Sequence, residues 1–179
     1  MKKIILSSMM IAFGIAAQAQ ENVTLNVKLN PIQTLVVNPA QKTVDLEYSS
    51  KDDYANGVTS GALTDHLSVF STGGFAVTVK SAGTHLTNTV ASGAHGHIEA
   101  GTIQIVASNG TDAINSATNN TISLSGSEQT LVSSIYGAVD KTINVEYKGA
   151  DANKYINYYV AGQEPTVYTT ELTYTIVAQ

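Results

Sequence analysis

The residues of this chain that could bind a metal ion lie close together near its middle. His95 and His97 are separated by one glycine, and Glu99 follows two positions later. A turn at Gly96 could direct both imidazoles to one ion, because imidazole and carboxylate groups are ligands for divalent metals. The glycine-rich setting holds no third ligand rigidly. We therefore interpret these histidines as solvated loop residues and predict no metal site.

Two further groups of side chains could bind calcium or sugar. Asp52 and Asp53 are adjacent carboxylates, but they lack the D-x-D-x-D-G spacing that surrounds a calcium ion, which favours a solvated turn. Tyr155, Tyr158 and Tyr159 could stack on sugar rings. Tyrosine is also a common strand residue, and the chain contains no tryptophan, so we favour a structural role for this cluster.

The composition argues against most catalytic and nucleic-acid-binding classes. The chain has no cysteine, which excludes a thiol nucleophile and cysteine-ligated clusters, and no G-x-S-x-G nucleophile motif occurs. The formal net charge is -5, and all basic residues are lysines, so there is no basic patch for nucleic acid. We therefore predict a protein that is not an enzyme, with no catalytic residues, no cofactor and no nucleic-acid partner.

Most of the chain alternates between apolar and polar residues, the pattern of half-buried β-strands. Such runs occupy residues 43–48, 75–80, 121–125, 142–148 and 168–176, and residues 103–107 are almost entirely apolar. Asn-Pro, Asn-Gly, Gly-Gly and Ser-Gly pairs between the runs are turn signals. The pattern predicts an all-β fold, an antiparallel β-sandwich of the immunoglobulin-like type.

Two stretches lack this alternation, and no helical stripe of convincing length is present. Residues 49–67 and residues 83–101 have the composition of long surface connections. A short helical turn is compatible with residues 111–117 or 151–155. We expect eight or nine strands in one domain, since single all-β domains commonly reach this size.

The start of the chain has the pattern of an export signal. Lys2 and Lys3 precede an apolar run at residues 4–16, and Ala17-Gln18-Ala19 is an A-x-A cleavage site. We expect residues 1–19 to be removed, residues 20–30 to form an N-terminal extension and residues 31–179 to form the β-sandwich. No later run approaches the roughly 18 apolar residues of a membrane span, so we expect none in the mature chain.

The extension itself is a strand with one apolar face. Residues 22–30 read N-V-T-L-N-V-K-L-N, so an extended backbone places Val23, Leu25, Val27 and Leu29 on the same side. Pro31 then interrupts the pattern before a second apolar run begins at Ile32. A single strand is not stable alone in water, so this face must pack either on its own domain or on another molecule.

The two ends of the mature chain resemble a pilin of the chaperone-usher class, in particular its archaic branch and the related spore-coat-U-like domains. The residues that carry this resemblance are the alternating run 23–29 and the terminal strand Y-T-T-E-L-T-Y-T-I-V-A-Q at residues 168–179. In that family the immunoglobulin-like domain lacks its final strand, which the N-terminal extension of the next subunit supplies. This chain departs from many members in having no disulfide near the first strand.

The resemblance implies both sides of a contact between subunits. Val23, Leu25, Val27 and Leu29 would be the donor-strand residues, and the accepting edge would include Leu172, Tyr174 and Ile176. It further implies a head-to-tail homopolymer at the cell surface, with a periplasmic chaperone and an outer-membrane usher as assembly partners. A contact of this kind does not close on itself and generates a fibre.

Two functions are compatible with these observations. The first is a structural subunit of an extracellular fibre, a pilus or fimbria with a role in adhesion or biofilm. The alternative is a secreted cell-wall or glycan-binding β-sandwich module, because the C-terminal strand is similar to that of WxL-type surface domains, although the W-x-L signature is missing. Filament formation would support the first function, and binding to insoluble glycan would support the second.

Overall fold

A computed structural model describes residues 20–88 and 96–179 of the chain. The predicted export signal at residues 1–19 and His95 lie outside the described residues. The chain divides into two compact units, Met1–Asn30 and Pro31–Gln179. Residues 20–30 contain no helix and no paired strand, so every described element belongs to the second unit.

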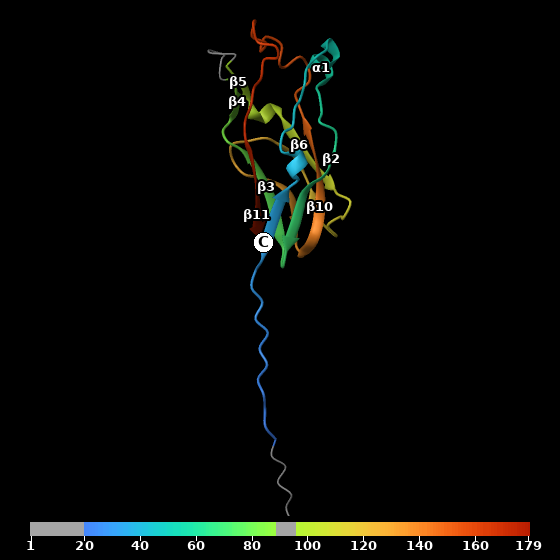
Figure 1. Ribbon diagram of the computed structural model, residues 1–179, viewed down its shortest axis with the longest axis vertical. Coiled ribbons are helices and arrows are strands. Elements are labelled where there is room, and N and C mark those ends of the chain that lie inside the picture. The colour runs from blue at the N-terminus through green and yellow to red at the C-terminus, as the bar shows by residue number, and fades with distance from the viewer. Residues whose placement is uncertain (1–19, 89–95) are drawn as a thin grey trace, which may run out of the picture. The chain divides into compact units, whose positions relative to one another are not determined.

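The regular elements of the second unit are mostly antiparallel strands (Figure 1). In chain order its elements are β1 (Gln33–Val37), η1 (Pro39–Gln41), α1 (Lys51–Asn56), β2 (Leu63–Ser71), β3 (Phe75–Ser81), β4 (His85–Thr87), β5 (His97–Glu99), η3 (Ala100–Thr102), β6 (Gln104–Asn109), β7 (Thr118–Asn119), β8 (Thr121–Ser123), β9 (Gln129–Ser134), β10 (Ala138–Lys148) and β11 (Leu172–Ala178). The prediction of an all-β antiparallel sandwich is confirmed.

Two larger sheets form the layers of the sandwich. One has the strand order β1-β2-β10-β6-β8, the other has the order β11-β3-β9-β7, and β4 and β5 form a separate hairpin. Side chains from both layers are completely buried between them, among them Leu67 on β2, Phe75 on β3 and Ile105 on β6. The core depends on these apolar contacts and on the strand ladders, since the chain has no cysteine to form a disulfide.

The region predicted as a long connection, residues 49–67, contains α1 and the first half of β2. A capping box starts α1: the Ser50 hydroxyl accepts a hydrogen bond from the Asp53 N–H, and the Asp53 carboxylate accepts one from the Ser50 N–H. The Asp53 carboxylate is thus used to begin a helix. Among the described residues, no helix is long and apolar enough to cross a membrane.

Residues 43–48 differ from the prediction in an informative way. Their side chains alternate between half-buried and exposed as the pattern predicts, but they belong to no strand in the described part of the chain. Residues 170–171, directly before β11, are likewise outside the named strands. At residues 43–48 the strand pattern is therefore present without a neighbouring strand, whereas the segment before β11 has hydrogen-bonded neighbours along one edge only.

Candidate functional site

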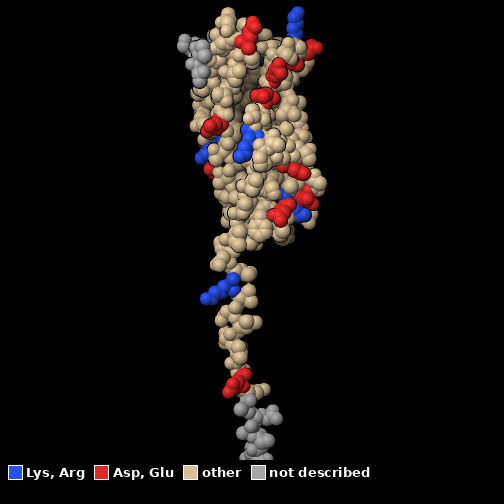
Figure 2. All heavy atoms as spheres, in the orientation of Figure 1, with Lys and Arg blue, Asp and Glu red and all other residues tan. Residues whose placement is uncertain are grey.

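These two segments are the walls of a long groove in the sandwich. Residues 41–48, which follow β1, form one wall. Residues 164–174, which include the first three residues of β11, form the other. Val44, Leu46 and Tyr48 alternate along the first wall and pack against the core. A hollow is visible in the upper part of the face drawn in Figure 2. Alternation on the wall matches the spacing of side chains on an extended strand.

Backbone hydrogen bonds hold one edge of the second wall, so its other edge faces the groove. Thr87 and Thr169 exchange two backbone hydrogen bonds of 2.9 and 3.1 Å, and the Ala82 N–H donates to the Glu171 carbonyl at 2.9 Å. Because alternate residues of a strand direct their backbone groups to opposite edges, Thr170 directs its N–H and C=O away from β3 and β4. The second wall therefore offers one backbone edge to a further strand.

The floor of the groove is mostly apolar. It is formed by Ile98, Ile103, Leu124, Tyr147 and Tyr155, all of which are buried. The groove has a volume of about 1310 Å³, which exceeds the roughly 300–1,000 Å³ of most small-molecule pockets. Its size and the apolar floor fit a large apolar occupant better than a compact ligand.

A chain of hydrogen bonds crosses the floor between the two walls. His66 Nδ1 lies 3.0 Å from the Gln41 side-chain oxygen, and His66 Nε2 lies 3.0 Å from the Tyr147 hydroxyl. The Tyr147 hydroxyl is also hydrogen-bonded to the Tyr174 hydroxyl. The Gln41 amide nitrogen donates to the Thr64 carbonyl, so its oxygen faces the histidine. The arrangement requires a proton on Nδ1 and a neutral ring whose Nε2 accepts from Tyr147.

Burial keeps this polar chain uncharged. His66 is only 1% exposed, and burial lowers the pKa of its imidazole. Burial also raises the pKa of the Tyr147 hydroxyl to about 12 and that of Tyr174 further still. At neutral pH the floor consequently carries no net charge, which suits an apolar strand above it.

We expect the folded domain to lose stability as the pH falls below about 6.5, the ordinary pKa of histidine. The unfolded chain takes up a proton at His66 in this range while the folded chain resists it. The free energy of unfolding then falls by up to about 1.4 kcal/mol per pH unit. Urea unfolding between pH 5 and 8 measures this slope.

The variant His66→Gln isolates the contribution of this one histidine. Whatever its stability at pH 8, its unfolding free energy should fall less steeply between pH 6.5 and 5 than that of the wild type. Equal slopes in the two proteins would contradict a neutral buried imidazole at this position.

Five tyrosines link the two walls at the other end of the groove. Tyr48 contacts Tyr54 and Tyr155, with ring centroids 5.3 and 5.1 Å apart. Tyr158 continues the series, 6.1 Å from Tyr155 and 6.0 Å from Tyr168. The contacts are tilted or edge-to-face, a favourable arrangement for aromatic rings. We call this set the tyrosine arch, since it runs from one wall to the other.

The three tyrosines that could stack on sugar rings, Tyr155, Tyr158 and Tyr159, lie in different environments. Tyr155 is buried, and its hydroxyl is hydrogen-bonded to that of Thr102. The Tyr158 ring packs between two others in the arch, whereas Tyr159 is 57% exposed. The three rings therefore do not form a common exposed platform.

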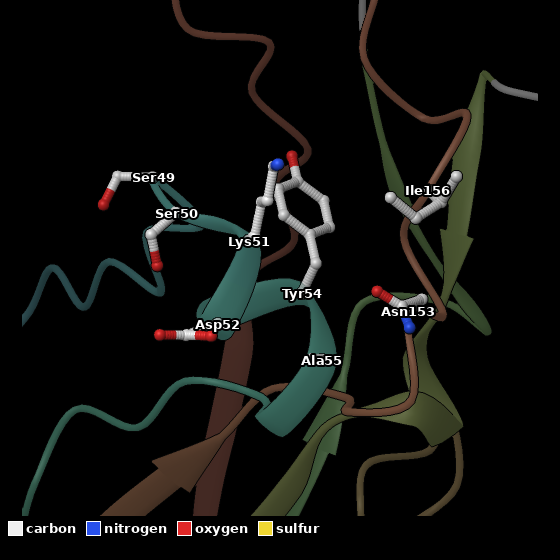
Figure 3. A pocket seen from close by; sticks show the side chains of 8 residues that line it. All are labelled: Ser49, Ser50, Lys51, Asp52, Tyr54, Ala55, Asn153 and Ile156. Atoms are coloured by element: carbon white, nitrogen blue, oxygen red, sulfur yellow. The ribbon is translucent and has the colours of Figure 1, made fainter.

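A smaller hollow adjoins the arch beside α1 (Figure 3). Lys51 and Tyr54 line it from the helix, and Asn153 and Ile156 line it from the loop opposite. Figure 3 shows the Asp52 carboxylate directed away from Asn153 and Ile156. Because the Asp53 carboxylate caps the helix, the two acidic residues do not converge on a common point here.

Two of the three residues predicted for the accepting edge line the groove. On the accepting side, Leu172 and Tyr174 line the groove, while Ile176 lies further along β11 and does not. On the donor side the four apolar side chains are between 77% and 92% exposed: Val23, Leu25, Val27 and Leu29. Sequence reasoning missed the wall formed by Val44 and Leu46 as an accepting edge, although its alternation was visible.

No model of a known protein family matches this chain, and no curated protein sequence matches it.

Proposed function

We propose that this chain is a structural, non-enzymatic subunit of an extracellular fibre, in which residues 22–30 of one copy fill the groove of the next. The observation that carries the proposal is a complementary pair of features. One is an apolar groove between two segments that lack a strand between them, and the other is an exposed strand with a single apolar face.

The two features are similar in length and share a periodicity. Residues 22–30 comprise nine residues, about 30 Å of extended chain, and the groove walls at residues 41–48 and 164–174 comprise eight and eleven residues. Side chains on one face of a strand repeat every second residue, as do Val44, Leu46 and Tyr48 on the opposite wall. A strand inserted between the walls would pair with both edges and direct its apolar face to the floor.

The expected gain in free energy is large enough to sustain a polymer. Burying four aliphatic side chains contributes roughly 1.5–3 kcal/mol each, before the costs of association. Backbone hydrogen bonds on both edges add about 0.5–1.5 kcal/mol each. This mode of binding is strand addition, in which the ladder supplies affinity and the side chains supply register.

The connection to the domain favours a second copy as the partner. The extension joins the domain at Ile32, beside the start of β1, whereas only the last residue of β1, Val37, lines the groove. To enter its own groove the extension would first run back along all of β1, which uses about half of its length. A neighbouring copy can supply the whole strand, and repeating this contact produces an open fibre.

We further propose a location at the cell surface and an assisted assembly for this subunit. Residues 1–19 export the chain, the fibre forms at the cell surface, and it serves adhesion or biofilm formation. A periplasmic chaperone would protect the groove until the next subunit arrives, and an outer-membrane usher would order the additions. The exposed apolar side chains and the open groove support such protection, since both are aggregation hazards in a free subunit.

The direct test is complementation with a peptide. We expect a chain of residues 31–179 to be monomeric and to melt at a lower temperature than the assembled protein. Adding a synthetic peptide of residues 21–30 should raise the melting temperature and give a one-to-one complex, because a ligand that binds only the folded state stabilises it. Differential scanning calorimetry and analytical ultracentrifugation measure the two effects.

A peptide of the same composition with the apolar and polar positions exchanged is the matched control and should have no effect. The proposal is wrong if the shortened chain is as stable as the full-length protein and the native peptide does not bind.

A further inference from the structure

The outer face of the β4–β5 hairpin brings together three side chains that sequence spacing did not connect. His85 is the direct cross-strand partner of Glu99, and His97 lies two residues before Glu99 on the same strand. All three side chains therefore project from one face of the hairpin. The ring centroids of His85 and His97 are 4.3 Å apart.

The distances between their ligand atoms are close to those of a metal site. Glu99 Oε1 lies 3.1 Å from His85 Nε2 and 3.7 Å from His97 Nε2, and the three ligand atoms all lie within 4.8 Å of one another. In a tetrahedral zinc site, metal–ligand bonds of about 2.0–2.2 Å place neighbouring ligand atoms roughly 3.3–3.5 Å apart. The two distances to Glu99 Oε1 differ from that spacing by only a few tenths of an ångström.

One of the imidazoles is already oriented for this role. His85 Nδ1 lies 2.9 Å from the Thr84 hydroxyl oxygen, which can accept a hydrogen bond from an N–H at that position. The Glu99 carboxylate beside His85 Nε2 only accepts hydrogen bonds, so Nε2 carries a proton until a metal ion displaces it, and the ring then keeps its proton on Nδ1 beside Thr84. Each of the three side chains is at least 40% exposed, so an ion can enter from solvent and keep an open coordination position.

We propose that His85, His97 and Glu99 form a binding site for one divalent transition-metal ion, with zinc as the ion that it fits. Two imidazoles and one carboxylate with an open fourth position suit zinc, whereas magnesium and calcium favour sites made of oxygen ligands. The ion joins the two strands of the hairpin across their register. This metal site does not depend on the fibre proposal, because all three ligands come from one copy of the chain.

The position of the site connects it to the groove. Leu86 and Ile98, which alternate with the ligands along β4 and β5, line the groove from the opposite face of the same hairpin. An ion on the outer face would hold the two strands in register and thus stabilise part of the groove lining. Zinc should therefore raise the melting temperature of the chain.

Isothermal titration calorimetry of untagged protein with zinc chloride tests the site. We expect one zinc ion per chain, no saturable binding of magnesium, and an affinity at least tenfold lower for each of His85→Ala, His97→Ala and Glu99→Gln. Glu128→Gln is the matched control, because Glu128 also has an exposed carboxylate that forms an ion pair, in its case with Lys80. That variant should bind zinc like the wild type.

Circular dichroism establishes that each variant is folded before it is titrated. The proposal is overturned if wild-type protein shows no saturable zinc binding, or if the three ligand variants bind as tightly as the wild type. One zinc ion per two chains would also overturn it, because that stoichiometry indicates a bridge between molecules.

Discussion

Replacing Leu25 with aspartate should leave the chain of residues 20–179 monomeric under conditions in which the wild type assembles. Leu25 lies in the middle of the exposed apolar face, and its side chain is 86% exposed before assembly. In the proposed contact it enters an apolar floor formed by residues such as Ile103 and Leu124. Losing its burial costs roughly 1.5–3 kcal/mol, and burying a carboxylate without a partner costs several kcal/mol more. Together these two costs should lower the affinity of the strand for the groove by more than a thousandfold.

Asn26→Asp is the matched control, since it adds the same charge one residue away on the polar face of the strand. It should assemble almost as well as the wild type. Electron microscopy and light scattering after size-exclusion chromatography distinguish filaments from monomers. Filaments of normal length from Leu25→Asp, or equal loss in both variants, would contradict insertion of this face into a groove.

Two variants that each fail to assemble should form a dimer when mixed. Leu25→Asp damages the donated strand and leaves the groove intact, whereas Leu46→Asp places a charge in the groove wall and leaves the strand intact. In a head-to-tail polymer, the strand of the second variant can enter the groove of the first. The product can grow no further, because its remaining groove and its remaining strand are both damaged.

Size-exclusion chromatography with light scattering should therefore give a one-to-one dimer from the mixture and monomers from each variant alone. Thr43→Asp is the control for the wall, because Thr43 is exposed and does not line the groove. A mixture of Thr43→Asp with Leu25→Asp should form longer chains. A mixture of the two damaged variants that stays monomeric would exclude a contact between these surfaces.

The strands were readable from sequence because burial on one face imposes a period of two residues. Residues 75–80 and 142–148 were predicted as strands and form parts of β3 and β10. The first half of β2 was missed because Asp65 and His66 interrupt its apolar pattern. Asp65 accepts a hydrogen bond from the Thr111 N–H, and His66 is held by Gln41 and Tyr147. These partners are distant in sequence, so no local signal indicated them.

The groove could be predicted only in part. The alternation of residues 43–48 indicated a strand, but a local pattern cannot show that the strand lacks a neighbour, since this depends on where all the others lie. The pairing of His85 with Glu99 also depends on register, which sequence spacing alone did not give. The short helix α1 had a readable signal in Ser50-x-x-Asp53, which belongs to the capping box.

The tyrosine arch has a consequence for how a strand would enter. Its rings come from both sides of the opening and contact one another. The slot thus keeps its width before any occupant arrives, and the incoming segment alone has to become ordered. A host preorganised in this way favours rapid capture and a single depth of insertion, so that successive members of a fibre would be spaced uniformly.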